Sequence, residues 1–156
     1  MPDVEYAFLA DAADARPGHK FAVIGGGVSR VGGPTFPLRH PHLSLVVGLL
    51  LTAPELGSEH EIRFVLLSPD GQELSSAEAR IRAAGEADGR DTVLTFGIDL
   101  WNLSFPDPGD YSFRILIDGS ERKRLPLIVE RRQAGAAGEG GTDAIQPPFP
   151  PPPGRA

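Results

Sequence analysis

The feature that most constrains this chain is an alternation of apolar and polar residues with a period of two. In residues 92–100 and 111–117, large apolar side chains occupy every second position. Successive side chains of an extended strand point to opposite faces, so the alternation predicts strands that each bury one face. The positions expected to share one core are Leu45, Phe64, Phe96, Ile98, Tyr111, Phe113 and Ile115.

About eight strands are expected, with very little helix. The clear segments are residues 4–10, 20–24, 42–52, 61–67, 92–100, 111–118 and 124–130. Residues 75–87 are rich in helix formers, but Ile81 is their one large apolar residue, so a helix there has no apolar stripe to bury. We interpret this segment as an outer strand that continues from Glu73, with a short helix as the alternative. Strands without intervening helices favour an antiparallel β-sandwich, in which sheet packs on sheet.

Local turn and edge features accompany these strands. Asp118-Gly119 predicts a tight hairpin, because glycine accepts positive φ. Pro126, in the returning strand, lacks the N–H that a ladder needs and so indicates a sheet edge or a bulge. The stretch from Asp107 to Phe113, D-P-G-D-Y-S-F, resembles the tyrosine corner of immunoglobulin-like domains, in which a Tyr near a strand start bonds to nearby backbone. The resemblance implies an immunoglobulin-like sandwich.

Three longer segments are V-E-Y-A-F-L-A-D-A-A, F-A-V-I-G-G-G and P-G-D-Y-S-F-R-I-L-I-D-G, the last followed by L-P-L-I-V. Together they resemble a family of small uncharacterised bacterial proteins, over most of residues 3–130. That family is a domain of unknown function. The resemblance therefore implies a bacterial origin and a domain boundary near residue 130, and it transfers no catalytic residue.

The run Gly25-Gly26-Gly27 follows four apolar residues, much as a dinucleotide-binding loop follows a strand. A dinucleotide fingerprint needs a further glycine where this chain has Arg30, and it must open a helix. The residues that follow contain three prolines and two more glycines, which forbids a helix. We interpret the run as a bend or bulge at a rim of the fold. If the rim binds a small ligand, Arg30 and Trp101 are the other candidate contacts.

Candidate metal and catalytic groups are sparse. His40 and His42 are two positions apart and would share a face of a strand, but Pro41 disfavours a regular ladder, so we expect both in a solvated loop. The aspartates near the expected strand ends are most simply turn formers, and no serine lies in a nucleophile elbow. The sequence therefore predicts no catalytic residue, no cofactor and no metal, and we do not expect an enzyme.

Composition narrows the function classes further. The chain has 156 residues, a formal net charge of -6 and no cysteine. The acidic balance disfavours a nucleic-acid partner, because such proteins need a basic surface. No stretch approaches the ~20 apolar residues that span a bilayer, and no basic start precedes an apolar run as in a secretory signal. We expect a cytoplasmic protein with neither nucleic-acid nor membrane partners.

The composition changes after Val129, first to a Gly/Ala-rich stretch and then to a polyproline segment. Such a stretch buries too little apolar surface to fold alone. We therefore predict a β-sandwich domain at residues 1–132 and a disordered tail at residues 133–156. Polyproline segments can dock into aromatic grooves, so the candidate docking residues are Phe149, Pro150, Pro151, Pro152 and Pro153.

These features favour a non-catalytic protein-interaction or scaffold module. Its partner is expected to be another protein or a second copy, bound through sheet faces or edges. The alternative is a sandwich that binds a small ligand or carbohydrate at its rim loops.

Overall fold

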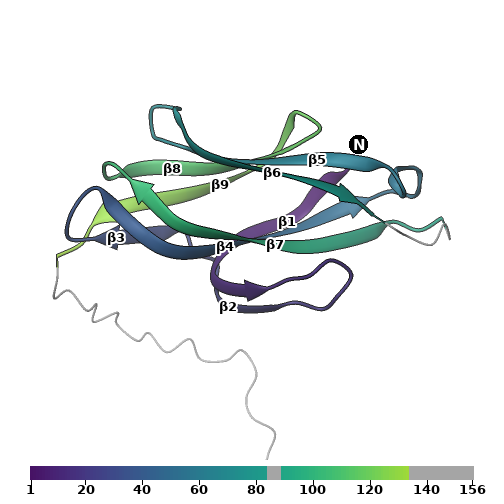
Figure 1. Cartoon of the computed structure of the whole chain (residues 1–156), viewed down its shortest axis with the longest axis horizontal. Coiled ribbons are helices and arrows are strands. Elements are labelled where there is room, and N and C mark those ends of the chain that lie inside the picture. Colours follow the sequence, from purple (N-terminus) through teal and green to yellow (C-terminus); the bar gives the residue numbers. More distant parts are fainter. Residues whose placement is uncertain (84–88, 134–156) are drawn as a thin grey trace, which may run out of the picture.

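The computed structural model describes residues 1–83 and 89–133, and within them the chain forms nine strands and one short 3₁₀ helix (Figure 1). The elements are β1 (Asp3–Asp14), β2 (Ala22–Gly26), β3 (Arg30–Gly33), β4 (Leu38–Leu51), η1 (Ala53–Glu55), β5 (Glu59–Leu67), β6 (Glu73–Arg82), β7 (Thr92–Phe105), β8 (Gly109–Ile117) and β9 (Ser120–Arg131). The all-β class expected from the alternation is confirmed. β6 is a strand, as interpreted, and not a helix.

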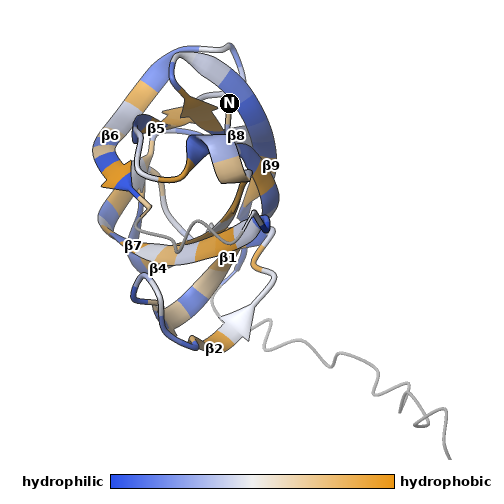
Figure 2. Ribbon diagram, turned by 90° about the vertical axis from the view of Figure 1, so that its right-hand side faces the viewer, coloured by the Kyte–Doolittle hydropathy of each residue, from blue (hydrophilic) through white to orange (hydrophobic). Residues whose placement is uncertain are grey.

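The strands form two sheets. Sheet A has the order β2-β1-β4-β7, and sheet B has the order β3-β9-β8-β5-β6. Every neighbouring pair is antiparallel except β3 and β9, which run parallel. The fully antiparallel arrangement expected from the sequence is wrong at this pair. The chain passes from β2 in sheet A to β3 in sheet B, and no hairpin joins β3 to β9. The end-on view in Figure 2 shows sheet A facing a curled sheet B across the interior.

The core lies between the two sheets and follows the predicted alternation. Of the seven positions predicted to share it, six are buried, and the seventh, Ile98, packs half-buried against the same cluster. The six are Leu45, Phe64, Phe96, Tyr111, Phe113 and Ile115. A slip of one residue would move a strand's whole apolar set to the opposite face, so their common burial confirms the expected phase of these strands.

The far end of the β1–β2 hairpin folds back over the outer face of β4 and β7, so β4 is buried on both faces where the sequence predicted one. The backbone N–H of Ala13 donates to the Ser44 hydroxyl at 3.2 Å, and that of Gly97 donates to the Ala15 carbonyl at 3.0 Å. Figure 1 shows β2 and its turn below β4 and β7. Val46, on the covered face, is 0% exposed. Double coverage explains why the run at residues 43–51 is apolar at most positions.

The expected turn and edge features are also present. Asp118 and Gly119 have φ of 48° and 82° in the turn between β8 and β9. Pro126 is opposite Ser112 of β8, while β3 joins the other side of β9 only from Ile128 onward. Pro126 therefore lies at a local edge, where its missing N–H breaks no ladder bond.

Candidate functional site

Edge strands define the first candidate site, because an edge exposes backbone N–H and C=O groups to any strand that approaches. The edges of the two sheets are β2, β7, β3 and β6. β2 and β3 are five and four residues long and contain glycines. In β7, the Gly97 N–H is bonded to the Ala15 carbonyl, and Asn102 interrupts the regular strand with φ of 52°. β6 has ten residues with neither glycine nor proline, so it is the least protected of these edges.

The outer face of β6 carries charges that pair with β5. Arg63 of β5 lies 3.0 Å from Glu73 and 3.5 Å from Glu78. Arg80 of β6 lies 3.8 Å from Glu59. All of these side chains are partly or largely exposed, so the pairs stabilise the monomer little. Their charges remain available to a partner strand.

The inner face of β6 carries small side chains. Ala77 and Ala79 are opposite Phe64 and Ile62 of β5, and Ala77 lines a small hollow of about 20 Å³ together with Leu100 of β7. Larger apolar side chains along β6 and β7 are only partly buried; they are Leu74, Ile81, Leu94, Ile98 and Leu100. We call the gap between β6 and β7, lined by these five residues, the β6–β7 seam.

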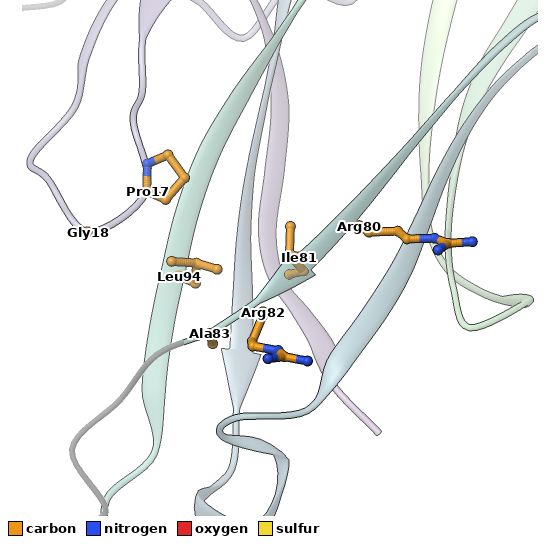
Figure 3. Close-up of a pocket in the computed structure, with 7 residues that line it drawn as sticks. All are labelled: Pro17, Gly18, Arg80, Ile81, Arg82, Ala83 and Leu94. Carbon is orange, nitrogen blue, oxygen red and sulfur yellow. The ribbon is translucent and has the colours of Figure 1, made fainter.

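A hollow lies at each end of the seam. The first has a volume of about 400 Å³ and is lined by Pro17, Gly18, Arg80, Ile81, Arg82, Ala83 and Leu94. Figure 3 shows that the side chains of Arg80 and Arg82 point away from Leu94, so the apolar part of the lining consists of Leu94, Ile81, Ala83 and Pro17. The second has a volume of about 370 Å³, and its lining includes Leu74, Pro106 and Tyr111. Both hollows adjoin the free edge of β6.

The second candidate site is a polar cluster where the β1–β2 hairpin crosses β4 and β7. The Nδ1 atom of His42 lies 2.9 Å from the Asp11 carbonyl oxygen, and its Nε2 atom lies 2.8 Å from Oδ1 of Asp99. The His42 ring therefore links β4 to the backbone of β1 and to a side chain of β7. The Ser44 hydroxyl donates to the same Asp99 oxygen at 3.0 Å, and the Trp101 ring lies 4.2 Å from the His42 ring.

This cluster has the residue types of a hydrolytic triad but not their order. Asp99 stands between Ser44 and His42, so the histidine is not placed to take a proton from the serine hydroxyl. Ser44 is also only 1% exposed. The hydrogen bonds from His42, and secondly from Ser44, hold the pKa of Asp99 below its ordinary value. The arrangement therefore fastens the hairpin to sheet A and does not build a nucleophile.

A similar pair lies at the turn between β8 and β9. The Nδ1 atom of His60 lies 2.8 Å from Oδ2 of Asp118. The hydrogen bond from His60, followed by that from the Glu61 N–H, lowers the pKa of Asp118. Within residues 1–83 and 89–133, no group of three or more His, Cys, Asp or Glu side chains is placed to hold a metal ion.

The predicted solvated loop for His40 and His42 is wrong, because both lie within β4. In the register with β7, His40 is opposite Leu103 and His42 is opposite Trp101. The register skips Pro41 between them, so the missing N–H of the proline does not break the ladder.

The glycine run forms the bend that the sequence predicted. Gly25 and Gly27 have φ of 62° and 82°, a region that favours glycine. The N–H groups of Gly27 and Val28 both donate to the Leu9 carbonyl, at 2.8 and 2.9 Å. A Cβ atom at Gly25 would overlap the Asp11 carboxylate. With these donors used inside the fold and an acidic side chain beside them, the run is poorly suited to a phosphate.

The predicted rim contacts come from three strands. The glycine run lies at the end of β2 and Trp101 lies on β7. Asp11 of β1 lies between them, because its carboxylate is beside Gly25 and its carbonyl oxygen is 2.9 Å from the His42 ring, which contacts Trp101. Arg30 lies in β3 of sheet B, 3.5 Å from Glu130. The candidate docking residues 149–153, and all but the first residue of the predicted tail, lie outside the described residues.

Sequence reasoning missed both the seam and the His42 cluster. One sequence feature could have indicated the seam: the small residues Ser75, Ala77 and Ala79 occupy every second position of this strand. No local sequence feature indicates the His42 cluster, because His42 and Asp99 are 57 positions apart and come into contact only through the pairing of β4 with β7.

One family model covers the part of the chain that builds the two sheets. It describes a family of unknown function, DUF6941, and it matches residues 5–130. The chain belongs to this family. The DUF6941 match ends one residue before the last residue of β9.

The chain was also compared with solved structures. A solved structure of the Pseudomonas fluorescens alkylpurine DNA glycosylase AlkC, bound to DNA containing an abasic site analog, is similar with a TM-score of 0.46 and 9% sequence identity. The match covers 83% of this chain and 30% of the glycosylase chain, and at this level it assigns neither fold nor function. No curated protein matches the sequence. Among the residues that the structure describes, no helix is long and apolar enough to cross a membrane.

Proposed function

We propose that this DUF6941 domain is a non-catalytic protein-interaction or scaffold module that binds a protein partner along the β6–β7 seam. The supporting observation is the edge of β6, whose register against β5 is regular from Ser75 to Arg82, beside a row of half-buried apolar side chains. An extended segment that adds to such an edge gains backbone hydrogen bonds, while its alternate side chains enter pockets that set specificity. The hollows at the two ends of the seam lie where such side chains would arrive.

The finer architecture is part of the same proposal. We infer that the two sheets pack as an immunoglobulin-like β-sandwich. The hydroxyl of Tyr111 donates to the Asp107 carbonyl at 2.7 Å, a bond of the kind found in a tyrosine corner, and this supports the inference. A cytoplasmic location and a docking role for residues 149–153 complete the proposal, on the sequence grounds given above.

Site-specific photo-cross-linking in the producing cells tests the seam as a binding site. A photoreactive phenylalanine analogue at Ser76, which is exposed on β6, should yield adducts of defined mass. The same analogue at Arg124, which is exposed on β9, is the matched control. Absence of adducts at Ser76, or equal yield at both positions, contradicts the proposed site.

Binding of a carbohydrate or another small ligand is the second candidate, and Trp101 favours it. This side chain is 66% exposed and lies against His42, with the Asp99 carboxylate nearby. An open aromatic face beside a few polar groups can orient a sugar ring. Trp101 is the one tryptophan of the chain, so its fluorescence reports binding directly. A saturable change that is lost in Asp99→Ala supports this candidate, and a flat signal across a panel of sugars at millimolar concentration rejects it.

A further inference from the structure

We propose that the partner at the β6 edge is a second copy of this chain, paired antiparallel about a two-fold axis at Ala79. The inference rests on the proposed interaction at the seam and names its occupant. A two-fold axis brings the same surface of both copies together, so the edge must be complementary to itself. The charge order of β6 meets that requirement, because Glu78 and Arg80 flank Ala79 on the outer face.

The register follows from the geometry of an antiparallel pair. Directly opposite residues share a face of the sheet. With the axis at Ala79, Glu78 is opposite the partner's Arg80, and Arg80 is opposite the partner's Glu78. Both pairs form on the solvent side of sheet B, beside Arg63 and Glu61 of β5.

Charge also distinguishes the neighbouring registers. An axis at Glu78 sets two glutamates against each other. An axis at Arg80 sets two arginines against each other, although it also places Glu78 opposite the partner's Arg82. Like charges directly opposite destabilise a pair of strands, whereas opposite charges stabilise it. Of these three registers, the one centred on Ala79 has opposite-charge pairs and no like-charge pair.

This pairing extends a charge pattern that the monomer already has. Arg63 and Glu78 are opposite each other on β5 and β6, with 3.5 Å between Nε and Oε1, and Glu61 is opposite Arg80. Across the dimer, the outer row reads Arg63, Glu78, the partner's Arg80 and the partner's Glu61. The sign of the charge alternates over all four strands, and the row related by the axis repeats the same order.

The inner face allows the same pairing. Ala79 is opposite the partner's Ala79, and Ile81 is opposite the partner's Ala77, so each isoleucine pairs with a small side chain and no two large side chains are opposite each other. β6 has no proline and no charge on its inner face, which are the devices that natural edges use to prevent pairing. The hollow lined by Ile81 and Arg82 borders the part of β6 that is opposite the partner's Ala77 and Ser76 in this register.

Sedimentation velocity of the full chain tests the pairing. The loading range should run from about 10 µM to 1 mM, because a single-edge contact is smaller than a standard interface of about 1,600 Å² and should bind weakly. Wild type should form a reversible dimer. Glu78→Arg and Arg80→Glu should each weaken it by about tenfold or more, since both cross-strand pairs become like-charged. An equimolar mixture of the two variants should form a heterodimer, because each altered position then meets the opposite charge.

Two exposed positions away from β6 provide matched controls for net charge. Glu5→Arg and Arg39→Glu change the charge by the same amounts and should leave the dimer intact. The inference is overturned by a wild-type chain that stays monomeric over the whole range. It is equally overturned by a dimer that resists both reversals at β6, or by a mixture that fails to associate.

Disulfide cross-linking tests the register of the two β6 strands without changing any charge. The chain has no cysteine, so in Ala79→Cys a disulfide can form only between two copies. Opposite Cα atoms in a sheet are about 4.5 to 5.5 Å apart, within the range of a disulfide. In the control Ser76→Cys, the two thiols would be about 20 Å apart in the proposed register. Equal cross-linking of the two variants, or none in Ala79→Cys, overturns the register. If cross-linking at Ser76 then captures a different protein, the seam remains an interaction site and only its occupant is wrong.

Discussion

Replacing Phe113 with alanine tests the centre of the core. β8 is the middle strand of sheet B, and Phe113 is 3% exposed, opposite Leu66 of β5 on one side and Leu125 of β9 on the other. Ladders on both sides hold these neighbours in place, so they are poorly able to close the space that the ring leaves. Loss of a phenyl group from such a site costs about 3 to 5 kcal/mol of unfolding free energy.

Urea unfolding followed by circular dichroism measures this loss. A cost of about 4 kcal/mol and a slope of about 2 kcal/mol per molar urea lower the midpoint by about 2 M. The matched control is Phe21→Ala, because Phe21 is 39% exposed and its ring contacts Tyr6 at a centroid distance of 6.2 Å. That change should cost less than about 1 kcal/mol.

The outcome separates two placements of Phe113. A loss below about 1 kcal/mol, or one no larger than that of Phe21→Ala, refutes its burial between the sheets. Such a result would also refute the register of β8 against β5 and β9, because a slip of one residue turns every side chain of the strand to the other face. An unchanged urea slope is required for either conclusion, since it shows that the denatured state is the same.

Three further changes test local contacts. Tyr111→Phe removes a hydroxyl hydrogen bond and should lower the unfolding free energy in urea by about 1 to 2 kcal/mol; an unchanged midpoint contradicts the bond. The folded-state pKa of Asp99 lies below its ordinary value of 3.8, so its stabilisation is present above that value and is lost as the pH falls through the folded pKa. The difference in melting temperature between wild type and Asp99→Asn should therefore be steady above about pH 5 and should shrink as the pH falls below 3.8, and a difference that stays constant below 3.8 contradicts this. Gly25→Ala should lower the melting temperature more than Gly18→Ala, because both have positive φ but only the first meets Asp11; equal losses contradict that packing.

The period of two located the core because strand geometry imposes it directly. Tyr111, Phe113 and Ile115 alternate along β8, and each lies where the alternation places it. The same logic identified β6, where Ile81 alone could not form a helical stripe. Local chemistry was equally informative at the Asp118-Gly119 turn, since positive φ is a property of the residues themselves.

Features that depend on neighbours far away in sequence could not be predicted in this way. β3 has four residues, two of them glycines, and becomes a strand only because β9 lies beside it. β4 is buried on both faces because the β1–β2 hairpin folds over it, and no local pattern predicts that cover. His42 was expected in a loop for the same reason, since its partners Asp11 and Asp99 come from two other strands.

The four edge strands differ in how well they are protected against pairing with another strand, and this difference bears on function. Shortness and glycines weaken β2 and β3, while Asn102 and the bond at Gly97 interrupt β7. A lysine on the inner face of β6 would have blocked pairing there at little cost, yet that face carries Ala77 and Ala79. The charges still limit the pairing, because the registers on either side of the one centred on Ala79 place Glu78 or Arg80 directly opposite its own copy. An open edge that limits its own registers is better suited to one defined pairing than to aggregation, and this is the physical basis for assigning it a partner.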